Sequence, residues 1–342
     1  MEAGSYVPNT VVALKLARAL ETPLEDLFSL AGEPPAAELP VEQALLLPSP
    51  DPPQPGQPVE LCRVGARLVA SAPAPVQWYF PASDAIVVGR SRYGGKAGGK
   101  TKVQILDPEQ DFRGRLLVAG CDPAISVLSR HVQAAGVELV LAHRNSSQAL
   151  ALLKAGCVHI AGTHLRDESS GESNIPAIAR LFPRRSVAVI SFAVWEEGIV
   201  TARGNPKSIR GIEHFARPDI RIVNREPGAG SRLLLDSHLQ RLGISPRRVR
   251  GYGETAQGHL PAAWQVRSGD ADCCIATRAA ARLFGLTFLP LVSERYDLAI
   301  PRHYLDTPAV QALLDTLGRT RFRRELESLG GYDSKAAGQR IL

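Results

Sequence analysis

The segment 224–232, with the sequence NREPGAGSR, combines residue types that can bind an anion. Gly228 and Gly230 permit turn conformations that other residues avoid, and Ser231 can cap a following helix. The free amides of a first helical turn, the helix dipole and a guanidinium such as that of Arg225 or Arg232 all attract negative charge. The segment therefore predicts either an ordinary strand-to-helix turn or an anion site, and the two arginines favour the anion site.

Three other junctions between an apolar run and a helical pattern also contain small polar residues. These residues are Asp122 and Ser126 at the first junction, Asn145, Ser146 and Ser147 at the second, and Thr255 and His259 at the third. Ligands of α/β sheets lie beyond the carboxyl ends of the strands, so the four junctions predict one shared cleft. A small oxyanion or a carboxylate- or phosphate-bearing metabolite suits its neutral donors. Asp122 would repel such a ligand unless its carboxylate is turned away or paired.

Two other patterns give weaker indications of a binding site. Residues 94–101 match the phosphate-binding pattern GxxxxGK[ST], but that chemistry needs a helix after the lysine, and 102–106 has a strand pattern. A hairpin tip is therefore favoured over a nucleotide site. Cys157, His159 and His164 are close in sequence, although an ordinary role for each is favoured over metal binding. No nucleophile has an obvious base, so we expect no catalytic residue, no metal ligand and no cofactor.

The elements that position these junctions alternate between strand and helix from residue 115 onward. This alternation predicts an α/β fold, with a parallel sheet covered by helices on both faces. The predicted strands are 116–119, 137–142, 158–160, 220–223, 273–276 and 287–291, and the predicted helices are 123–135, 146–155, 261–267 and 278–284. Before them, residues 59–112 have the short, punctuated strands of a small β module, predicted at 59–64, 67–71, 85–89 and 102–106.

The N-terminal region has a different composition. Two short helices are predicted within residues 1–31, one beginning at Thr10 and one after Pro23. Residues 32–58 are rich in proline and read as an extended linker, interrupted by an apolar stretch at 41–47.

Composition restricts the class of protein. The chain has 342 residues, a net charge of +6 and a pI near 9.2, which suits an anionic partner. Its five cysteines are odd in number and form no CxxC pair, as is typical of reduced thiols in the cytoplasm. No signal-peptide pattern or membrane-length apolar run is present. We therefore expect a cytoplasmic protein with no membrane partner.

Residues 1–31 resemble the last third of a Cro/C1-type helix-turn-helix domain. The resemblance rests on 2–8 (EAGSYVP), 13–20 (ALKLARAL) and 24–28 (LEDLF). It implies that the helix pair that reads DNA bases should precede Glu2, so that the recognition helices are absent from this segment. A start codon assigned too late is favoured over a loss of base recognition. A homodimer is expected, because such readers bind two half-sites.

Residues 113–342 resemble the periplasmic-binding-protein-like domain, a family related to molybdate- and tungstate-binding proteins. The matching motifs lie at 195–200, 204–206, 224–232, 269–272, 288–296 and 330–333. The resemblance implies two lobes hinged around a cleft, lobe 1 at about 113–200 and 298–342 and lobe 2 at about 201–297. It adds Thr163 to the candidate ligand residues. Cys121 stands where a molybdate carrier would offer serine, which departs from the family pattern.

The two resemblances together predict a ligand-responsive transcriptional regulator. Its cleft would bind a small anion such as molybdate or tungstate, or a ligand related to the molybdenum cofactor, and it would bind DNA if a helix-turn-helix precedes Met1. An enzyme or accessory protein of molybdenum cofactor biosynthesis is the alternative.

Overall fold

The computed structural model describes residues 10–20, 22, 40–48, 52–72, 83–89, 92–93, 99–167 and 170–342. The chain divides into two compact units, residues 1–40 and 41–342. Within the first unit, helix α1 spans Thr10–Ala19, as predicted. The helix predicted after Pro23 and the residues 2–8 of the helix-turn-helix resemblance lie outside the described residues.

The β module is a closed sheet. Its strands are β1 (Val41–Leu46), β2 (Pro58–Val64), β3 (Arg67–Ser71), β4 (Ala85–Val87), β5 (Arg92–Tyr93) and β6 (Gly99–Ile105), followed by the 3-10 helix η1 (Phe112–Gly114). Strand β1 pairs with both β3 and β6, which closes the sheet and leaves neither of these strands as an open edge. Alternate residues of β6 are buried in the interior.

The structure of the β module decides two predictions made from the sequence, the linker over 32–58 and the hairpin tip at 94–101. Residues 41–46 belong to the sheet, so the segment predicted as a linker over 32–58 contains a strand. The apolar run formed by Ala44 and Leu46 is buried inside the module, which explains why it interrupts the prolines. Strand β6 begins at Gly99, within residues 94–101, which confirms the predicted strand there and excludes the helix that a phosphate-binding loop requires.

The main sheet has mixed strand directions. Its order is β13-β10-β14-β9-β7-β8, with β15 (Tyr332–Asp333) paired to β10. Strands β7 (Leu116–Gly120), β8 (Leu139–His143) and β9 (Ile160–Thr163) are parallel, as predicted. Strands β10 (Val187–Thr201) and β14 (Thr287–Pro301) are antiparallel to each other, so the prediction of a wholly parallel sheet is wrong.

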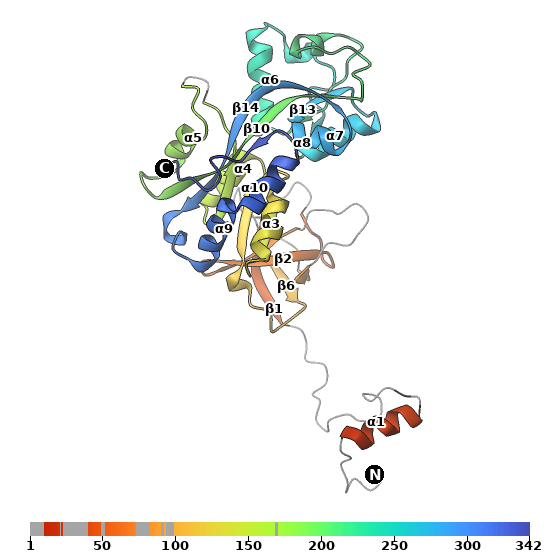
Figure 1. Cartoon of the computed structure of the whole chain (residues 1–342), viewed down its shortest axis with the longest axis vertical. Helices are drawn as coiled ribbons and strands as arrows, with labels where there is room; N and C mark the ends of the chain where they lie inside the picture. Colours follow the sequence, from red (N-terminus) through yellow and green to blue (C-terminus); the bar gives the residue numbers. More distant parts are fainter. Residues whose placement is uncertain are drawn as a thin grey trace. The chain divides into compact units, whose positions relative to one another are not determined.

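Lobe 1 is built on the parallel strands. Helices α3 (Ile125–Gln133), α9 (Pro308–Gly318) and α10 (Thr320–Ser328) share one apolar core over the sheet, and Figure 1 shows them side by side. Helices α4 (Ser146–Lys154) and α5 (Ile175–Leu181) share a second core, to which β2 and β3 of the β module contribute Cys62, Val64 and Val69. The 3-10 helix η4 (Arg302–Tyr304) connects β14 to α9.

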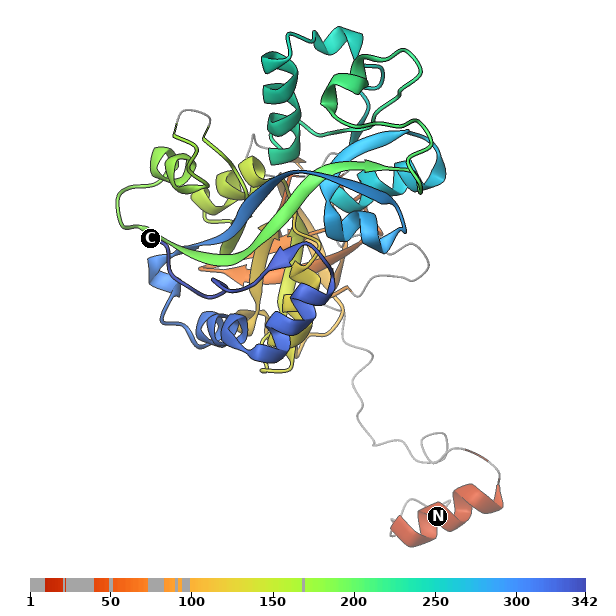
Figure 2. The same ribbon diagram turned by 45° about the horizontal axis from the view of Figure 1, so that its top comes forward.

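Lobe 2 is connected to lobe 1 by the long strands β10 and β14, which sweep across the molecule in Figure 2. Fifteen extended residues span about 50 Å, enough to reach both lobes. In β10, Phe192 packs in the core of lobe 1, whereas Ile199 and Val200 pack in lobe 2. Lobe 2 also contains η2 (Ile212–Ala216), β11 (Asn224–Arg225), α6 (Gly230–Arg241), η3 (Pro246–Arg248), β12 (Thr255–Ala256), α7 (His259–Ser268), β13 (Cys273–Thr277) and α8 (Arg278–Leu283).

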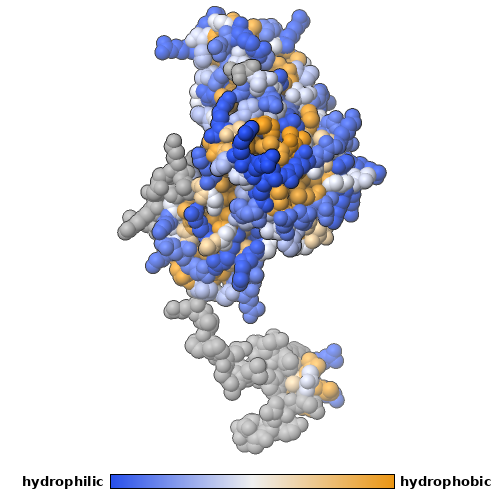
Figure 3. Space-filling view, turned by 90° about the vertical axis from the view of Figure 1, so that its left-hand side faces the viewer, coloured by the Kyte–Doolittle hydropathy of each residue, from blue (hydrophilic) through white to orange (hydrophobic). Residues whose placement is uncertain are grey.

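Apolar and hydrophilic side chains are unevenly distributed over the surface. Figure 3 shows one face on which apolar side chains form a patch bordered by hydrophilic ones. None of the helices formed by the described residues is long and apolar enough to span a bilayer. All five cysteines are buried and free, as the sequence predicted.

Candidate functional site

A buried polar cluster lies where the two lobes meet, and we call it the interlobe site. It comprises Cys121, His164, Glu197, Ser231, His259 and Glu294, all of them buried. Lobe 1 contributes Cys121 and His164, lobe 2 contributes Ser231 and His259, and the connecting strands contribute the two glutamates.

Cys121 is held at the carboxyl end of β7 by a close-packed tyrosine. Its amide donates to the hydroxyl of Tyr296 at 3.2 Å. That hydroxyl lies so close to Gly120 and Gly162 that a Cβ atom at either glycine would overlap it. Glycine at both positions therefore lets the β14 tyrosine approach the parallel strands and fix the Cys121 loop.

His164 follows β9 and is oriented by two hydrogen bonds. Its amide donates to Ser146 Oγ at the start of α4, over 3.1 Å. Its Nδ1 lies 2.8 Å from Glu294 Oε2 of β14. The ring also packs edge-on against Trp195, with 4.8 Å between the centroids. These contacts leave Nε2 as the free nitrogen of the His164 ring.

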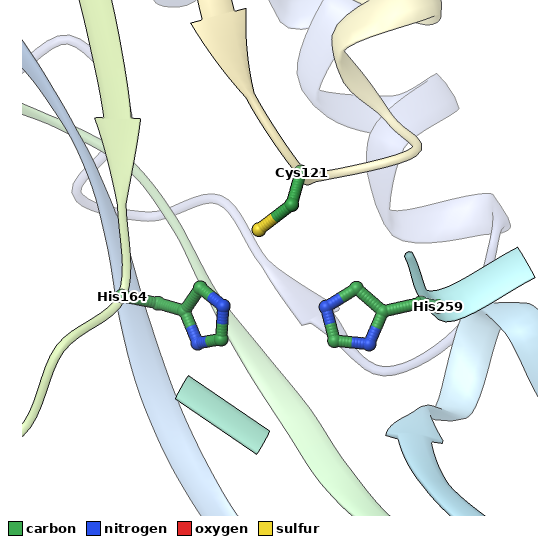
Figure 4. Close-up of side chains that lie close together, drawn as sticks. All are labelled: Cys121, His164 and His259. Carbon is green, nitrogen blue, oxygen red and sulfur yellow. The ribbon is translucent and has the colours of Figure 1, made fainter. Parts of the chain in front are cut away.

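His259 is the first residue of α7 and faces His164 across the lobe boundary. Its ring packs edge-on against the ring of Trp195, with 5.0 Å between the centroids. The centroid of the His164 ring is 5.8 Å away. Its Nδ1 is 3.8 Å from Glu197 Oε1. Figure 4 shows Cys121 and the two imidazole rings pointing toward a common centre.

Glu197 and Glu294 bring two carboxyl groups into the same buried volume. Glu294 lies opposite Trp195 in the β10–β14 register, and Glu197 accepts a hydrogen bond from Ser231 Oγ. Burial raises the pKa of Glu197 to about 8, with a further contribution from the negative charge of Glu294. The Glu197 carboxyl is therefore mostly protonated at neutral pH.

The pKa values of the two histidines are shifted in opposite directions. Burial opposes the charged form of His164, but the nearby Cys121 and Glu294 outweigh burial and raise the pKa of His164 well above its usual value. Burial lowers the pKa of His259 well below its usual value, and the positive charges of Arg225 and His164 add to that effect. A charged and a neutral imidazole therefore face each other.

Several buried polar atoms at the site have no hydrogen-bond partner in the described part of the chain. They are Asp122 Oδ2, His164 Nε2, Trp195 Nε1, Glu197 Oε2, Arg225 Nη1 and both ring nitrogens of His259. Buried polar groups are almost always hydrogen-bonded, and each unsatisfied one costs about 1–3 kcal/mol. The concentration of such atoms here indicates a place for a ligand.

The lobes are in contact around this cluster. Asn145 Nδ2 of lobe 1 donates to the carbonyl of Pro227 in lobe 2, over 3.2 Å. A Cβ atom at Gly230 would lie 2.6 Å from His164 Nδ1, and one at Gly258 would lie 2.6 Å from His143 Nε2. The two lobes are therefore in direct contact around the interlobe site.

Most residues of the four predicted junctions line this boundary. Asn145 caps α4, Ser146 contacts His164, and Gly228 approaches Asn145 from lobe 2. Gly230, Ser231 and His259 lie at the starts of α6 and α7. Arg225 is buried and forms a two-point ion pair with Glu226, over 3.0 and 3.1 Å.

The remaining predicted residues have other contacts. Asp122 accepts from the hydroxyl of Tyr332 at 2.7 Å, and burial raises its pKa to about 6. Thr163 donates to Asn174 Oδ1, and the guanidinium of Arg232 lies over the ring of Tyr252. Ser126, Ser147 and Thr255 are exposed.

Sequence reasoning assigned no role to the thiol of Cys121 and none to Glu197. His164 was considered only with its sequence neighbours Cys157 and His159, whereas the structure places it with Cys121 and His259. Glu294 lies within the motif 288–296 of the family resemblance, which assigned it no ligand role. The available signal was the position of Cys121 and His164 directly after parallel strands, where ligand residues gather.

Comparisons with known proteins agree with this architecture. Residues 129–318 match the model of the PBP superfamily domain. The chain is 34% identical over 240 residues to an uncharacterized protein, YvgK, of Bacillus subtilis (strain 168), covering 70% of this chain and 77% of that protein. It is 36% identical over 108 residues to an uncharacterized protein encoded in the 5′ region of a ferredoxin gene of Clostridium pasteurianum, covering 31% of this chain and 96% of that protein.

Solved structures with a similar arrangement are distant in sequence. A phosphate ABC transporter substrate-binding protein from Clostridium perfringens has a TM-score of 0.49 and 11% identity, covering 63% of this chain and 97% of its own. A tungstate ABC transporter protein from Geobacter sulfurreducens has a TM-score of 0.47 and 14% identity, covering 63% and 98%.

Proposed function

Because this chain belongs to the PBP superfamily, we propose that it is a ligand-binding protein whose two lobes close around a small ligand at the interlobe site. The observation that supports this function is a group of polar atoms on His164, Glu197 and His259 that are buried where the lobes meet and have no hydrogen-bond partner among the described residues. A bound ligand would satisfy those atoms, and because both lobes supply them, it would stabilise the closed arrangement.

A small anion such as molybdate or tungstate is the first ligand class to test. Three helices, α4, α6 and α7, begin at the lobe boundary, where helix dipoles favour negative charge. Arg225 adds a buried guanidinium with one nitrogen unpartnered. The resemblance of the chain to molybdate- and tungstate-binding proteins supports the same choice.

A thermal-shift screen of the whole chain tests this function. At a concentration about 100 times its Kd, a ligand adds about 2.7 kcal/mol to the free energy of unfolding, which raises Tm by several degrees. The screen should include molybdate, tungstate, sulfate, phosphate and divalent metal ions. If no small ligand raises Tm, the proposed function is wrong.

Gly230→Ala tests whether the response requires lobe closure. The new methyl group would collide with His164 of the opposite lobe only when the lobes are closed. The variant should fold, because alanine suits a helix, but its ligand-induced shift in Tm should be much smaller. Gly318→Ala in α9 is the matched control, since a Cβ atom there meets no neighbour within 4 Å.

We further propose that ligand binding regulates transcription, with the protein in the cytoplasm. Support comes from the resemblance of residues 2–28 to the closing helices of a helix-turn-helix domain and from the net charge of +6. The test is a mobility-shift assay with DNA from the region upstream of the gene, with and without the ligand found in the screen. Binding to that DNA that changes with ligand supports regulation, and no binding in either state overturns it.

A further inference from the structure

The geometry of Cys121, His164 and His259 points to a binding site for a thiophilic transition-metal ion such as Zn²⁺, assembled from both lobes. One ligand atom from each of these residues lies within 4.8 Å of the other two. Thiolate and imidazole are the ligands that zinc and related ions prefer. This inference shares one premise with the proposed function, namely that the two lobes close on each other.

The ring orientations identify the donor atoms. In Figure 4, one nitrogen of each imidazole points toward the other ring and toward the Cys121 sulfur. Nδ1 of His164 contacts Glu294, and Nδ1 of His259 faces Glu197 at 3.8 Å. The inward-pointing atoms are therefore the two Nε2 atoms, and neither has a hydrogen-bond partner.

The surroundings of the histidines match those of metal ligands. A metal-binding histidine usually directs its second ring nitrogen to a carboxylate, which fixes the ring and makes the ligand more basic. Glu294 has this position behind His164 at 2.8 Å, and Glu197 lies behind His259. A histidine buried only for packing would not need its Nε2 left unpartnered next to a thiol.

The dimensions fit a single ion better than a polyatomic one. Two imidazoles bound to one zinc ion through Nε2 have centroids roughly 5–6 Å apart, given Zn–N distances of about 2.0–2.1 Å. The observed separation is 5.8 Å. Donor atoms around tetrahedral zinc are ~3.3–3.8 Å apart, and the donors of Cys121, His164 and His259 lie within 4.8 Å of one another, so small side-chain shifts would complete the site.

The ionisable side chains around the three donors can accommodate a cation. Two carboxyl groups, Glu197 and Glu294, border the three donors, whereas the guanidinium of Arg225 is paired with Glu226. On binding, the Cys121 thiol and the charged His164 imidazole would each release a proton to solvent, because the ion binds thiolate and neutral imidazole. The charge of the bound ion would add to the attraction that the helix dipoles at this boundary exert on an anionic ligand.

Cobalt substitution tests the site in the full-length protein after treatment with a chelator. One equivalent of Co²⁺ should produce a thiolate-to-cobalt charge-transfer band, and Zn²⁺ should displace it. In Cys121→Ser the band should disappear and the affinity for Zn²⁺ should fall more than ~100-fold. Cys157→Ser is the control, because Cys157 is a buried thiol of the same lobe outside the cluster, and it should keep both band and affinity.

Glu294→Gln separates a positioning role from direct ligation. Its affinity for Zn²⁺ should fall ~10–100-fold while the cobalt spectrum keeps its thiolate band. The metal site is excluded if wild-type protein binds no Co²⁺ or Zn²⁺, or if the band survives in Cys121→Ser. A chain that binds molybdate or tungstate but no metal would refute this inference and leave the proposed function intact. Absence of any ligand response would instead refute the function.

Discussion

Two buried charged clusters in this molecule differ in how completely their polar atoms are paired. At the junction of the β module and lobe 1, Arg115 donates to Asp84 at 2.6 Å, to Glu138 at 2.8 Å and to the Leu61 carbonyl at 3.1 Å. The Leu61 amide donates to Asp84 in turn, at 2.7 Å. At the interlobe site, by contrast, His164, Glu197 and His259 keep unpartnered atoms.

The difference distinguishes a structural cluster from a binding site. Both clusters are buried and contain charged side chains, so burial alone does not identify function. A buried ion pair whose hydrogen bonds are all formed needs no further partner. Buried groups without partners lower the free energy of unfolding, so a ligand that pairs with them stabilises the protein. The substitutions below should therefore affect stability at the Arg115 cluster and binding at the interlobe site.

Arg115→Met should give the largest loss of stability. It leaves the Asp84 carboxylate buried without its cation, which costs about 3–5 kcal/mol in the free energy of unfolding. Urea denaturation measures that energy. Arg113→Ala, which removes only an exposed ion pair with Asp111, is the control and should cost less than about 1 kcal/mol. If both variants lose less than about 1 kcal/mol in the free energy of unfolding, the Arg115 cluster does not have the structural role proposed for it.

Glu60→Gln should remove a pH-dependent loss of stability that arises beside the Arg115 cluster. Burial, followed by the charge of Asp84, raises the pKa of Glu60 from 4.5 to about 7. The folded protein therefore holds this proton more tightly than the unfolded chain, and stability falls as pH rises from 4.5 to 7. The variant lacks that loss, so between about pH 5 and pH 8 it should gain roughly 1–2 kcal/mol relative to wild type. Urea denaturation at both pH values would contradict this expectation if the two proteins respond alike.

Glu197→Gln should change stability little and binding strongly. Glutamine has the same shape and can still accept the hydrogen bond from Ser231, so the free energy of unfolding should stay within ~1 kcal/mol of wild type. The ligand-induced rise in Tm should be greatly reduced, because Glu197 borders the donors of the site. Calorimetric unfolding with and without ligand measures both. A large loss of stability with normal binding would place Glu197 with the structural cluster.

Ser126→Ala should have the smallest effect. Ser126 was predicted as a ligand residue, but its hydroxyl is exposed and donates to the carbonyl of Pro123 within the start of lobe 1. The free energy of unfolding should match that of wild type within ~0.5 kcal/mol, and the ligand-induced rise in Tm should be unchanged. If the ligand-induced rise in Tm is lost, Ser126 is a ligand residue as predicted, and the residues at the start of α3 must change conformation when the ligand binds.

The order of the elements could be predicted from sequence because the signals are local. Apolar runs such as 116–119 form buried parallel strands, and the Asn145 capping pattern begins α4 where expected. The antiparallel course of β10 and β14 could not be predicted in the same way. The 85 residues between the end of β10 and the start of β14 belong to lobe 2, and strand pairing over such a separation leaves no local pattern.

Strand β10 ends at Thr201 and β14 begins at Thr287, so their pairing depends on how the whole of lobe 2 folds between them. Loop closure over such a distance becomes favourable only when many apolar contacts form together, and those contacts are not visible in any short window of sequence.

The sequence by itself determined the α/β character, the β module, and the small polar residues at the starts of α4, α6 and α7. These features follow from local periodicity, capping and turn chemistry. Only the tertiary structure decided that Cys121, His164 and His259 meet, because they come from three separate segments in two lobes. Their proximity is set by the packing of Tyr296 and Trp195 on the connecting strands, and packing between distant segments leaves no spacing rule in the sequence.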